Sequence, residues 1–114
     1  MRIIYRCYKK VSDGCDGKRV GFGGSLSPGS MARLFGVVDM YGIRSVDMGA
    51  GDGRFIVAAM ANGAGSAIGY ELPENLPQKL IFDAVSSRLP LRTTKSGEWI
   101  AKDIDEVYSS FDYQ

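Results

Sequence analysis

The sequence predicts an α/β domain in which helices flank a parallel sheet, and three features lead to this prediction. Residues 43–48 and 66–70 are short apolar runs of the kind that form buried strands. An apolar, alanine-rich stretch at 55–61 lies between them and is typical of a helix. A strand, a helix and a second strand of these lengths form a βαβ unit, whose strands run parallel. The 114 residues are expected to form one domain.

The N-terminal part, residues 1–26, is predicted to be a strand followed by a loop. Residues 2–8 alternate apolar with polar side chains, and Ile4 and Tyr8 are strand formers. Residues 12–26 are rich in Gly, Ser and Asp, which favours an irregular loop. Ser27 and Pro28 then form a typical helix start, with Ser27 as the N-cap. This helix is expected to reach Gly42, with an apolar face formed by Met31, Leu34, Phe35, Val38 and Tyr41.

Residues 27–114 are predicted to hold the parallel-sheet core. The strand at 43–48 leads into a tight glycine loop at 49–53, and the helix that follows ends at Asn62-Gly63. The second strand closes on Glu71, and a helix over 73–87 has Pro77 in its first turn. The inward face of this helix is predicted to consist of Leu76, Leu80, Ala84 and Val85. Trp99 is expected in the core, in a third strand over 99–102.

The composition excludes several classes of protein. Hydrophobic residues make up 45% of the chain and charged residues 24%, which is ordinary for a globular domain. No run of about eighteen apolar residues predicts a membrane span. The N-terminus lacks the apolar stretch of a signal peptide, so an intracellular location, cytoplasmic or nuclear, is expected. Cys7 and Cys15 form no CxxC pair and the chain has no histidine, which disfavours a metal site and a thiol nucleophile.

The charges are unevenly distributed along the chain, although the net charge is only +1. The basic N-terminal end contains Arg2, Arg6, Lys9, Lys10, Lys18 and Arg19. All charged residues after Lys102 are acidic. The basic end is compatible with a nucleic-acid partner, whereas a solvated surface accounts for the same cations without any partner.

The stretch from Val46 to Gly53, together with Glu71, carries the functional signal. Asp47 lies at the carboxyl end of its strand, where open α/β sheets bind ligands. Gly49 and Gly51 allow a sharp turn and a close approach of ligand to backbone, and Gly53 is expected to let the next helix pack tightly on the strand. Glu71 closes the next strand about 20 residues later, where a carboxylate can bind the two hydroxyls of a ribose.

Two classes of nucleotide suit this Rossmann-like pattern. A dinucleotide fingerprint requires a small residue three places after the second glycine, and this chain has Arg54 there. Asp52 would also face a pyrophosphate placed at the helix N-terminus. S-adenosylmethionine carries a sulfonium and an ammonium but no phosphate, so Asp47 and Asp52 suit it better. The charges therefore favour the methyl donor over NAD.

At these residues the chain resembles the class I S-adenosylmethionine-dependent methyltransferases. VDMGAGDG is similar to their first motif, and Glu71 to their ribose-binding acid. The loop Gly24-Ser25-Leu26-Ser27-Pro28 and the segment from Gly69 to Pro73 are similar to the non-SET histone lysine methyltransferases of the telomeric-silencing type. Ala101-Lys102-Asp103-Ile104 resembles that family's third motif, which implies that Asp103 contacts the adenine amino group. In that family Ser25 would be an acid and Lys102 a glycine.

The resemblance covers residues 22–104 and implies methyl transfer to an amine, in particular a lysine of a histone-like protein. The chain is interpreted as a truncated methyltransferase fold, because no segment up to Gln114 resembles the family's fourth motif or the later strands of its fold. No catalytic base is identified. A lysine channel lined by Tyr5, Tyr8 and Phe22 is less well supported than half-buried aromatic side chains of a strand.

Three hypotheses remain open. The first is a methyltransferase or its cofactor-binding part, with Asp47, Gly49, Gly51, Asp52, Gly53, Glu71 and Asp103 at the cofactor. The second is a non-catalytic module that binds S-adenosylmethionine or a partner, and the third is a dinucleotide-binding fragment of an oxidoreductase. A half-sheet also exposes a strand edge, which predicts a homo-oligomer that covers it.

Overall fold

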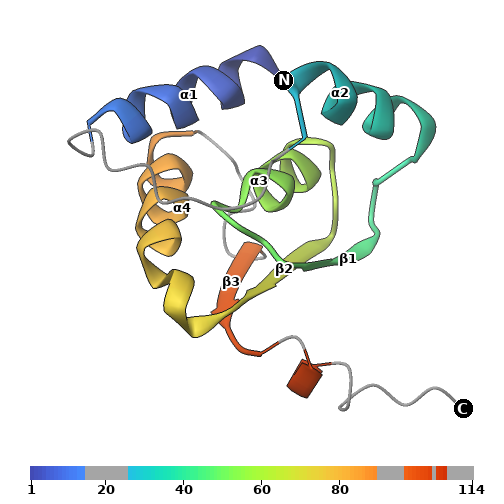
Figure 1. The fold of residues 1–114 in the computed structure, drawn as a ribbon. Coiled ribbons are helices and arrows are strands. Elements are labelled where there is room, and N and C mark those ends of the chain that lie inside the picture. Colours follow the sequence, from blue (N-terminus) through green and yellow to red (C-terminus); the bar gives the residue numbers. More distant parts are fainter. Residues whose placement is uncertain (15–25, 90–96, 104, 108–114) are drawn as a thin grey trace, which may run out of the picture.

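The computed structural model describes residues 1–14, 26–89, 97–103 and 105–107. Its elements, in chain order, are α1 (Arg2–Asp13), α2 (Pro28–Val37), β1 (Arg44–Met48), α3 (Arg54–Ala61), β2 (Ser66–Glu71), a 3₁₀ turn η1 (Pro73–Asn75), α4 (Leu76–Arg88) and β3 (Gly97–Ala101). Figure 1 shows the four helices on one side of the three strands. None of the described helices is long and apolar enough to cross a membrane.

The strands form one parallel sheet in the order β1-β2-β3, flanked by helices. Asp47 of β1, Gly69 of β2 and Trp99 of β3 lie opposite one another in register. The predicted α/β class and its Rossmann-like arrangement are therefore confirmed. All three strands end at the same edge of the sheet, which is the edge that carries the glycine loop.

Helix α3 packs closely on the sheet at a glycine of β2. A Cβ atom at Gly69 would lie 2.4 Å from Ile56 Cδ1 and 2.5 Å from Ala50 Cβ. Close helix–strand packing was expected at Gly53, but a Cβ there would lie 2.2 Å from the Phe82 ring of α4. The absence of a side chain at Gly53 thus leaves room for Phe82 of α4, whereas its absence at Gly69 leaves room for α3.

The predicted N-terminal strand is wrong, because residues 2–13 form helix α1. The buried residues of α1 are Ile4, Tyr8 and Val11, which recur at the spacing of one helix face. Ile4 and Tyr8 alone fit a strand as well, since four is an even spacing. Val11 breaks the strand alternation and completes the helical stripe, and its burial outweighs the strand propensity of the first eight residues.

The segment between α2 and β1 also differs from the prediction. Ser27 is the N-cap of α2, as expected, and its hydroxyl accepts from the Ser30 N–H at 3.2 Å. The helix ends at Val37 rather than at Gly42, because Val38 is extended and Asp39 Oδ1 accepts the Tyr41 N–H in a local turn. Strand β1 was predicted to be buried, but it lies at the sheet edge and none of its residues is fully buried.

Helix α4 has Pro77 in its first turn, as predicted, but its inward face matches the prediction only in part. Val85 is buried and Ala84 packs against the core, as expected, whereas Leu76 and Leu80 are exposed, at 49% and 70%. The other buried residues are Gln78, Ile81 and Phe82. The helix carries two apolar stripes, and the stripe with the larger Phe82 side chain faces α3 and the glycine loop.

Candidate ligand site at the glycine loop

The loop between β1 and α3 has the conformation that its glycines predict. Gly49, Gly51 and Gly53 have φ values of 86°, 57° and 79°, which side chains other than glycine rarely adopt. The Gly49 and Ala50 N–H groups both donate to the Tyr70 carbonyl, at 2.8 and 2.9 Å. The loop thereby folds back over the carboxyl end of β2.

Gly51 is held in place by two side chains from other strands. Its N–H donates to Glu71 Oε1 at 2.8 Å, and its carbonyl accepts from the Trp99 indole N–H at 2.8 Å. Both side chains are buried, with exposed fractions of 7% for Glu71 and 5% for Trp99. Trp99 is therefore a core residue, as predicted, and it also fixes the loop.

Glu71 is a structural acceptor as well as a candidate ligand group. Besides the Gly51 N–H, its carboxylate accepts from the Leu72 N–H at 2.8 Å and from Asn75 Nδ2 at 3.1 Å. A carboxylate has about four acceptor positions, so one remains, on Oε1. That capacity allows one hydrogen bond from a ligand hydroxyl while the loop stays anchored.

Asp52, which is buried, and Arg54, which is partly exposed, form an ion pair beside helix α1. The guanidinium donates to both carboxylate oxygens, with Nη2 2.6 Å from Oδ2 and Nε 3.0 Å from Oδ1. Its central carbon lies 5.0 Å from the centroid of the Tyr5 ring and 4.9 Å from that of Tyr8. The Asp52 carboxylate is therefore neutralised within the protein, rather than directed at a cofactor.

Tyr8 adds a third anchor to the loop. Its hydroxyl donates to the Asp52 carbonyl at 2.9 Å. Burial, followed by the charge of Asp52, raises the pKa of the Tyr8 phenol far above its usual value. The hydroxyl consequently remains a donor across the physiological pH range. Tyr5 lies beside it, and its hydroxyl donates to the Leu26 carbonyl.

The N-terminus of α3 has no side-chain cap but lies beside an acidic side chain of the loop. Gly53 is its N-cap, and the Arg54 N–H donates weakly to Asp52 Oδ1 at 3.4 Å. Helix N-termini attract anions because their first N–H groups lack partners within the helix. Here the negative Asp52 carboxylate lies beside the first N–H group of α3, which disfavours a second anion close to it.

Of the two aspartates in the motif, Asp47 is the one whose carboxylate remains available to a ligand. It is half-buried at the end of β1, and no described group donates a hydrogen bond to its carboxylate. Burial, followed by the negative charge of Glu71, raises the pKa of Asp47 to about 6. The two carboxylates therefore form an acidic edge that a cation would stabilise.

A backbone hydrogen bond places Asp103 near this edge. The Lys102 N–H donates to the Glu71 carbonyl at 2.8 Å, which places Asp103 one residue further along the chain. Its side chain is exposed and accepts the Asp105 N–H at 2.8 Å. Asp103 thus serves as a local turn acceptor, and one carboxylate oxygen remains without a described partner.

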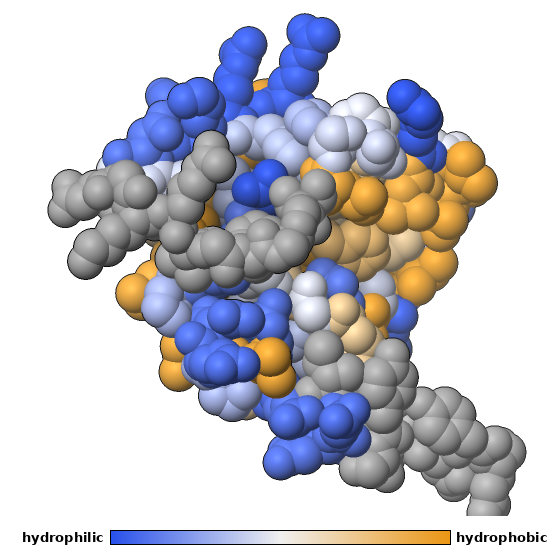
Figure 2. Space-filling view, in the orientation of Figure 1, coloured by the Kyte–Doolittle hydropathy of each residue, from blue (hydrophilic) through white to orange (hydrophobic). Residues whose placement is uncertain are grey.

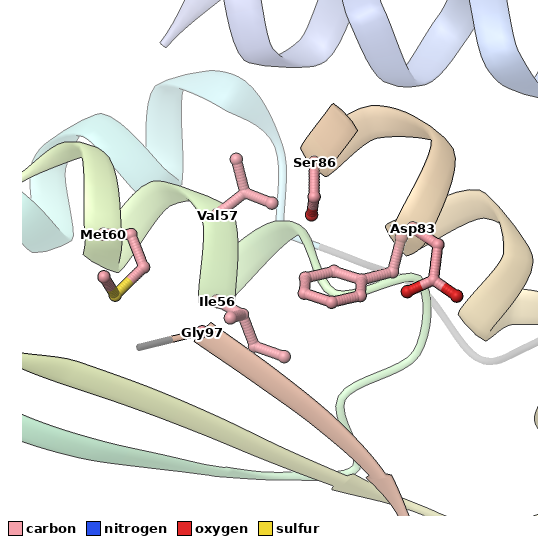
Figure 3. A pocket seen from close by; sticks show the side chains of 7 residues that line it. Ile56, Val57, Met60, Asp83, Ser86 and Gly97 are labelled. Atoms are coloured by element: carbon pink, nitrogen blue, oxygen red, sulfur yellow. The ribbon is translucent and has the colours of Figure 1, made fainter. Parts of the chain in front are cut away.

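One pocket of about 200 Å³ lies in the helix layer, away from this edge. Figure 3 shows it between α3 and α4, beside the start of β3. It is lined by Ile56, Val57, Met60, Phe82, Asp83, Ser86 and Gly97. Its acid, Asp83, is bound to Lys79 at 3.0 Å, and its lining contains both apolar and polar residues but none of the predicted ligand groups.

The structure brings together most of the predicted site and adds residues that were not predicted. Asp47, the three loop glycines and Glu71 lie at one edge, with Asp103 next to Glu71. The added residues are Tyr8, Arg54, Asn75 and Trp99, which hold the loop from separate segments. Gly24, Ser25 and Phe22 lie outside the described residues. Comparisons with models of known protein families and with curated protein sequences found no match for this chain.

Proposed function

We propose that this chain binds S-adenosylmethionine at the carboxyl ends of β1 and β2, as the cofactor-binding part of a class I methyltransferase. The observation that carries the proposal is the charge arrangement around the glycine loop. Asp47 is an acid without a described donor, and the α3 N-terminus lies beside the Asp52 carboxylate, which is paired with Arg54. A cationic ligand suits this edge and an anionic one does not.

The hydrogen-bond donors of the glycine loop disfavour a dinucleotide. In dinucleotide-binding folds the loop N–H groups and the helix N-terminus bind the pyrophosphate. Here the Gly49, Ala50 and Gly51 N–H groups all donate to acceptors within the protein. A pyrophosphate would displace these bonds and would also lie close to the Asp47 and Glu71 carboxylates.

In this proposal Asp47 faces the ammonium and sulfonium of the ligand, Gly49 and Gly51 allow its close approach, and Glu71 accepts one ribose hydroxyl. Asp103 contributes its remaining oxygen to the adenine amino group. Gly53 and the Asp52–Arg54 pair support the loop from behind. When bound, S-adenosylmethionine would supply an electrophilic methyl group, whose transfer to a nucleophile leaves the sulfonium as a neutral thioether.

The resemblance extends the proposal to a lysine acceptor on a histone-like protein. Such an acceptor must lose its proton before it can act as a nucleophile, and burial in an apolar channel favours that loss. The chain's own contribution would be to position donor and acceptor. No described side chain is assigned as a base.

The test is calorimetric titration with S-adenosylmethionine, S-adenosylhomocysteine and NADH near neutral pH. We expect the two adenosyl ligands to bind and NADH to fail. Asp47→Asn should weaken S-adenosylmethionine about tenfold, since it removes the charge nearest the cation. Asp83→Asn, which removes an equal charge in the exposed Lys79 pair, should change nothing.

Glu71→Ala is a poor substitute for Asp47→Asn, because it also removes the Gly51 anchor and would reduce binding through the loop alone. NADH binding with no adenosyl binding would contradict the proposal. Adenosyl binding without methylation of any protein, histones included, would leave a binding module rather than an enzyme.

A further inference from the structure

The apolar residues beside the pocket between α3 and α4 differ from those on the surface of the molecule. Figure 2 shows hydrophobic side chains on the surface, and Val37 and Tyr41, for example, are 85% and 83% exposed. The apolar lining of the pocket is instead at most 6% exposed and consists of Ile56, Val57, Met60 and Phe82. A cavity of about 200 Å³ lies beside these buried side chains. Cavities between packed helices are common ligand sites.

Two walls of this pocket are fixed by contacts outside it. Ile56 packs on β2, where a Cβ atom at Gly69 would lie 2.4 Å from Ile56 Cδ1. Phe82 packs on the glycine loop, where a Cβ atom at Gly53 would lie 2.2 Å from its ring. A shift of either side chain into the pocket would give up this close packing. The pocket is therefore preformed and does not close by a small rearrangement.

Gly97 of β3 forms the floor of the pocket and has no side chain. A Cβ atom there would lie 3.4 Å from Ile56 Cγ2 and 3.5 Å from Met60 Cγ, which are ordinary contact distances. Close packing therefore does not require a glycine, and its presence leaves the backbone of β3 uncovered toward the pocket. A flat ring can lie against such a floor, and the Met60 thioether beside it makes favourable contacts with aromatic rings.

Ser86 supplies the polar group that a ligand can bind. Figure 3 shows its hydroxyl directed into the pocket, and none of the described residues forms a hydrogen bond with it. A hydroxyl can both donate and accept a hydrogen bond. Asp83, the charged residue of the lining, is already bound to Lys79. The lining is thus suited to an uncharged polar group rather than to an ion.

We infer that this pocket binds a single uncharged aromatic ring that carries a hydroxyl group on a short arm. An apolar cavity of about 150 Å³ holds one benzene molecule. Of the 200 Å³ here, roughly 50 Å³ remain for a one-carbon arm and its hydroxyl. The ring lies over Gly97 between Met60 and Phe82, and the hydroxyl binds Ser86. The pocket is separate from the edge that holds the glycine loop, so the inference does not depend on the proposed function.

The experiment titrates the full chain with benzyl alcohol, toluene or cyclohexylmethanol and follows assigned methyl signals by NMR. We expect benzyl alcohol to shift the methyl signals of Ile56, Val57 and Met60, with a dissociation constant of about 0.1 to 1 mM. Cyclohexylmethanol keeps the hydroxyl but has a thicker, puckered ring, so it should bind more weakly than benzyl alcohol.

Three variants test the assignment of the residues. Ser86→Ala should weaken benzyl alcohol about fivefold and leave toluene, which has no hydroxyl, unchanged. Ser87→Ala is the matched control, because its hydroxyl donates to the Ala84 carbonyl outside the lining, and it should bind both ligands as the wild type does. Gly97→Val places a side chain on the floor and should abolish binding of both. Trp99 fluorescence verifies that each variant keeps its fold, since the indole is bound to the glycine loop.

A wild-type chain whose pocket methyl signals do not respond to benzyl alcohol would overturn the inference. Unchanged affinity for benzyl alcohol in Ser86→Ala would exclude the hydroxyl contact, and equal binding of cyclohexylmethanol would exclude an aromatic ligand class. Binding that persists in a folded Gly97→Val variant would place the ligand elsewhere and would overturn the inference equally.

Discussion

The carboxyl edge of the sheet and its β1 edge are built in opposite ways. At the carboxyl edge, side chains from α1, β2 and β3 bind the glycine loop through Tyr8, Glu71 and Trp99. At the β1 edge, apolar side chains are exposed and no described strand pairs with the backbone. The first region is held by contacts within the chain, whereas the second leaves apolar side chains exposed to solvent.

This difference bears on how each region would bind. A loop whose backbone bonds are already made does not have to be ordered by its ligand, so little conformational entropy is lost on binding. The exposed side chains at the β1 edge make few contacts within the described chain. Substitutions should therefore affect folding at the carboxyl edge much more than at the β1 edge.

The largest expected effect comes from Arg54→Leu. This change leaves the Asp52 carboxylate buried without a partner, which should lower the free energy of unfolding by about 3 kcal/mol. Urea denaturation followed by Trp99 fluorescence measures it. Lys79→Leu, which breaks the exposed pair with Asp83, should cost less than about 1 kcal/mol. Equal losses in the two variants would show that the Asp52–Arg54 pair is not an anchor.

Tyr8→Phe tests the contact between α1 and the loop. The substitution removes the hydroxyl that donates to the Asp52 carbonyl and should lower the free energy of unfolding by about 1 kcal/mol. The same change at Tyr41, which is 83% exposed, should have no measurable effect. The same denaturation experiment distinguishes them, and an unchanged Tyr8→Phe variant would contradict the anchoring role.

Gln78 differs from Tyr8 and Trp99, because its buried side chain makes no described hydrogen bond. It is fully buried in the first turn of α4, and within the described residues neither its amide nitrogen nor its oxygen has a hydrogen-bond partner. Gln78→Leu removes this unsatisfied amide and should raise the free energy of unfolding by about 1 kcal/mol. A loss of stability would mean that the amide does have a partner in solution.

The smallest effect is expected at the open edge. Val37→Lys exchanges a side chain that is 85% exposed and should change the free energy of unfolding by less than about 0.5 kcal/mol. Thermal denaturation at low concentration measures it. A large loss there would show that Val37 supports the fold of the monomer.

The central βαβ unit was predictable because its signals are local. Two short apolar runs, a glycine loop and Asn62-Gly63 lie within one stretch, and the structure forms β1, α3 and β2 from it. The type of α1 was not predictable from its first eight residues, because Ile4 and Tyr8 fit either periodicity. The exposure of β1 also depends on the sheet's neighbours rather than on the strand itself.

The site was predictable to the extent that it follows the motif. Asp47, the glycines and Glu71 come from consecutive elements of the βαβ unit, so their meeting at one edge follows from parallel strands. The contacts of Tyr8 with Asp52 and of Trp99 with Gly51 join residues far apart in sequence. Arg54 carried a signal as the missing small residue, but its partners Tyr5 and Tyr8 became apparent only when residues 2–13 proved helical.

The central claim, that the carboxyl edge accepts a cationic adenosyl ligand, is tested most directly by the pH dependence of S-adenosylmethionine binding. The pKa of Asp47 is raised to about 6, so this carboxyl is protonated at lower pH and ionised above. A cation prefers the ionised form, and we expect affinity to rise up to about tenfold between about pH 5 and pH 7, with release of a proton. Asp47→Asn should abolish this rise. An affinity that falls with pH, or a rise that persists in Asp47→Asn, would contradict the account.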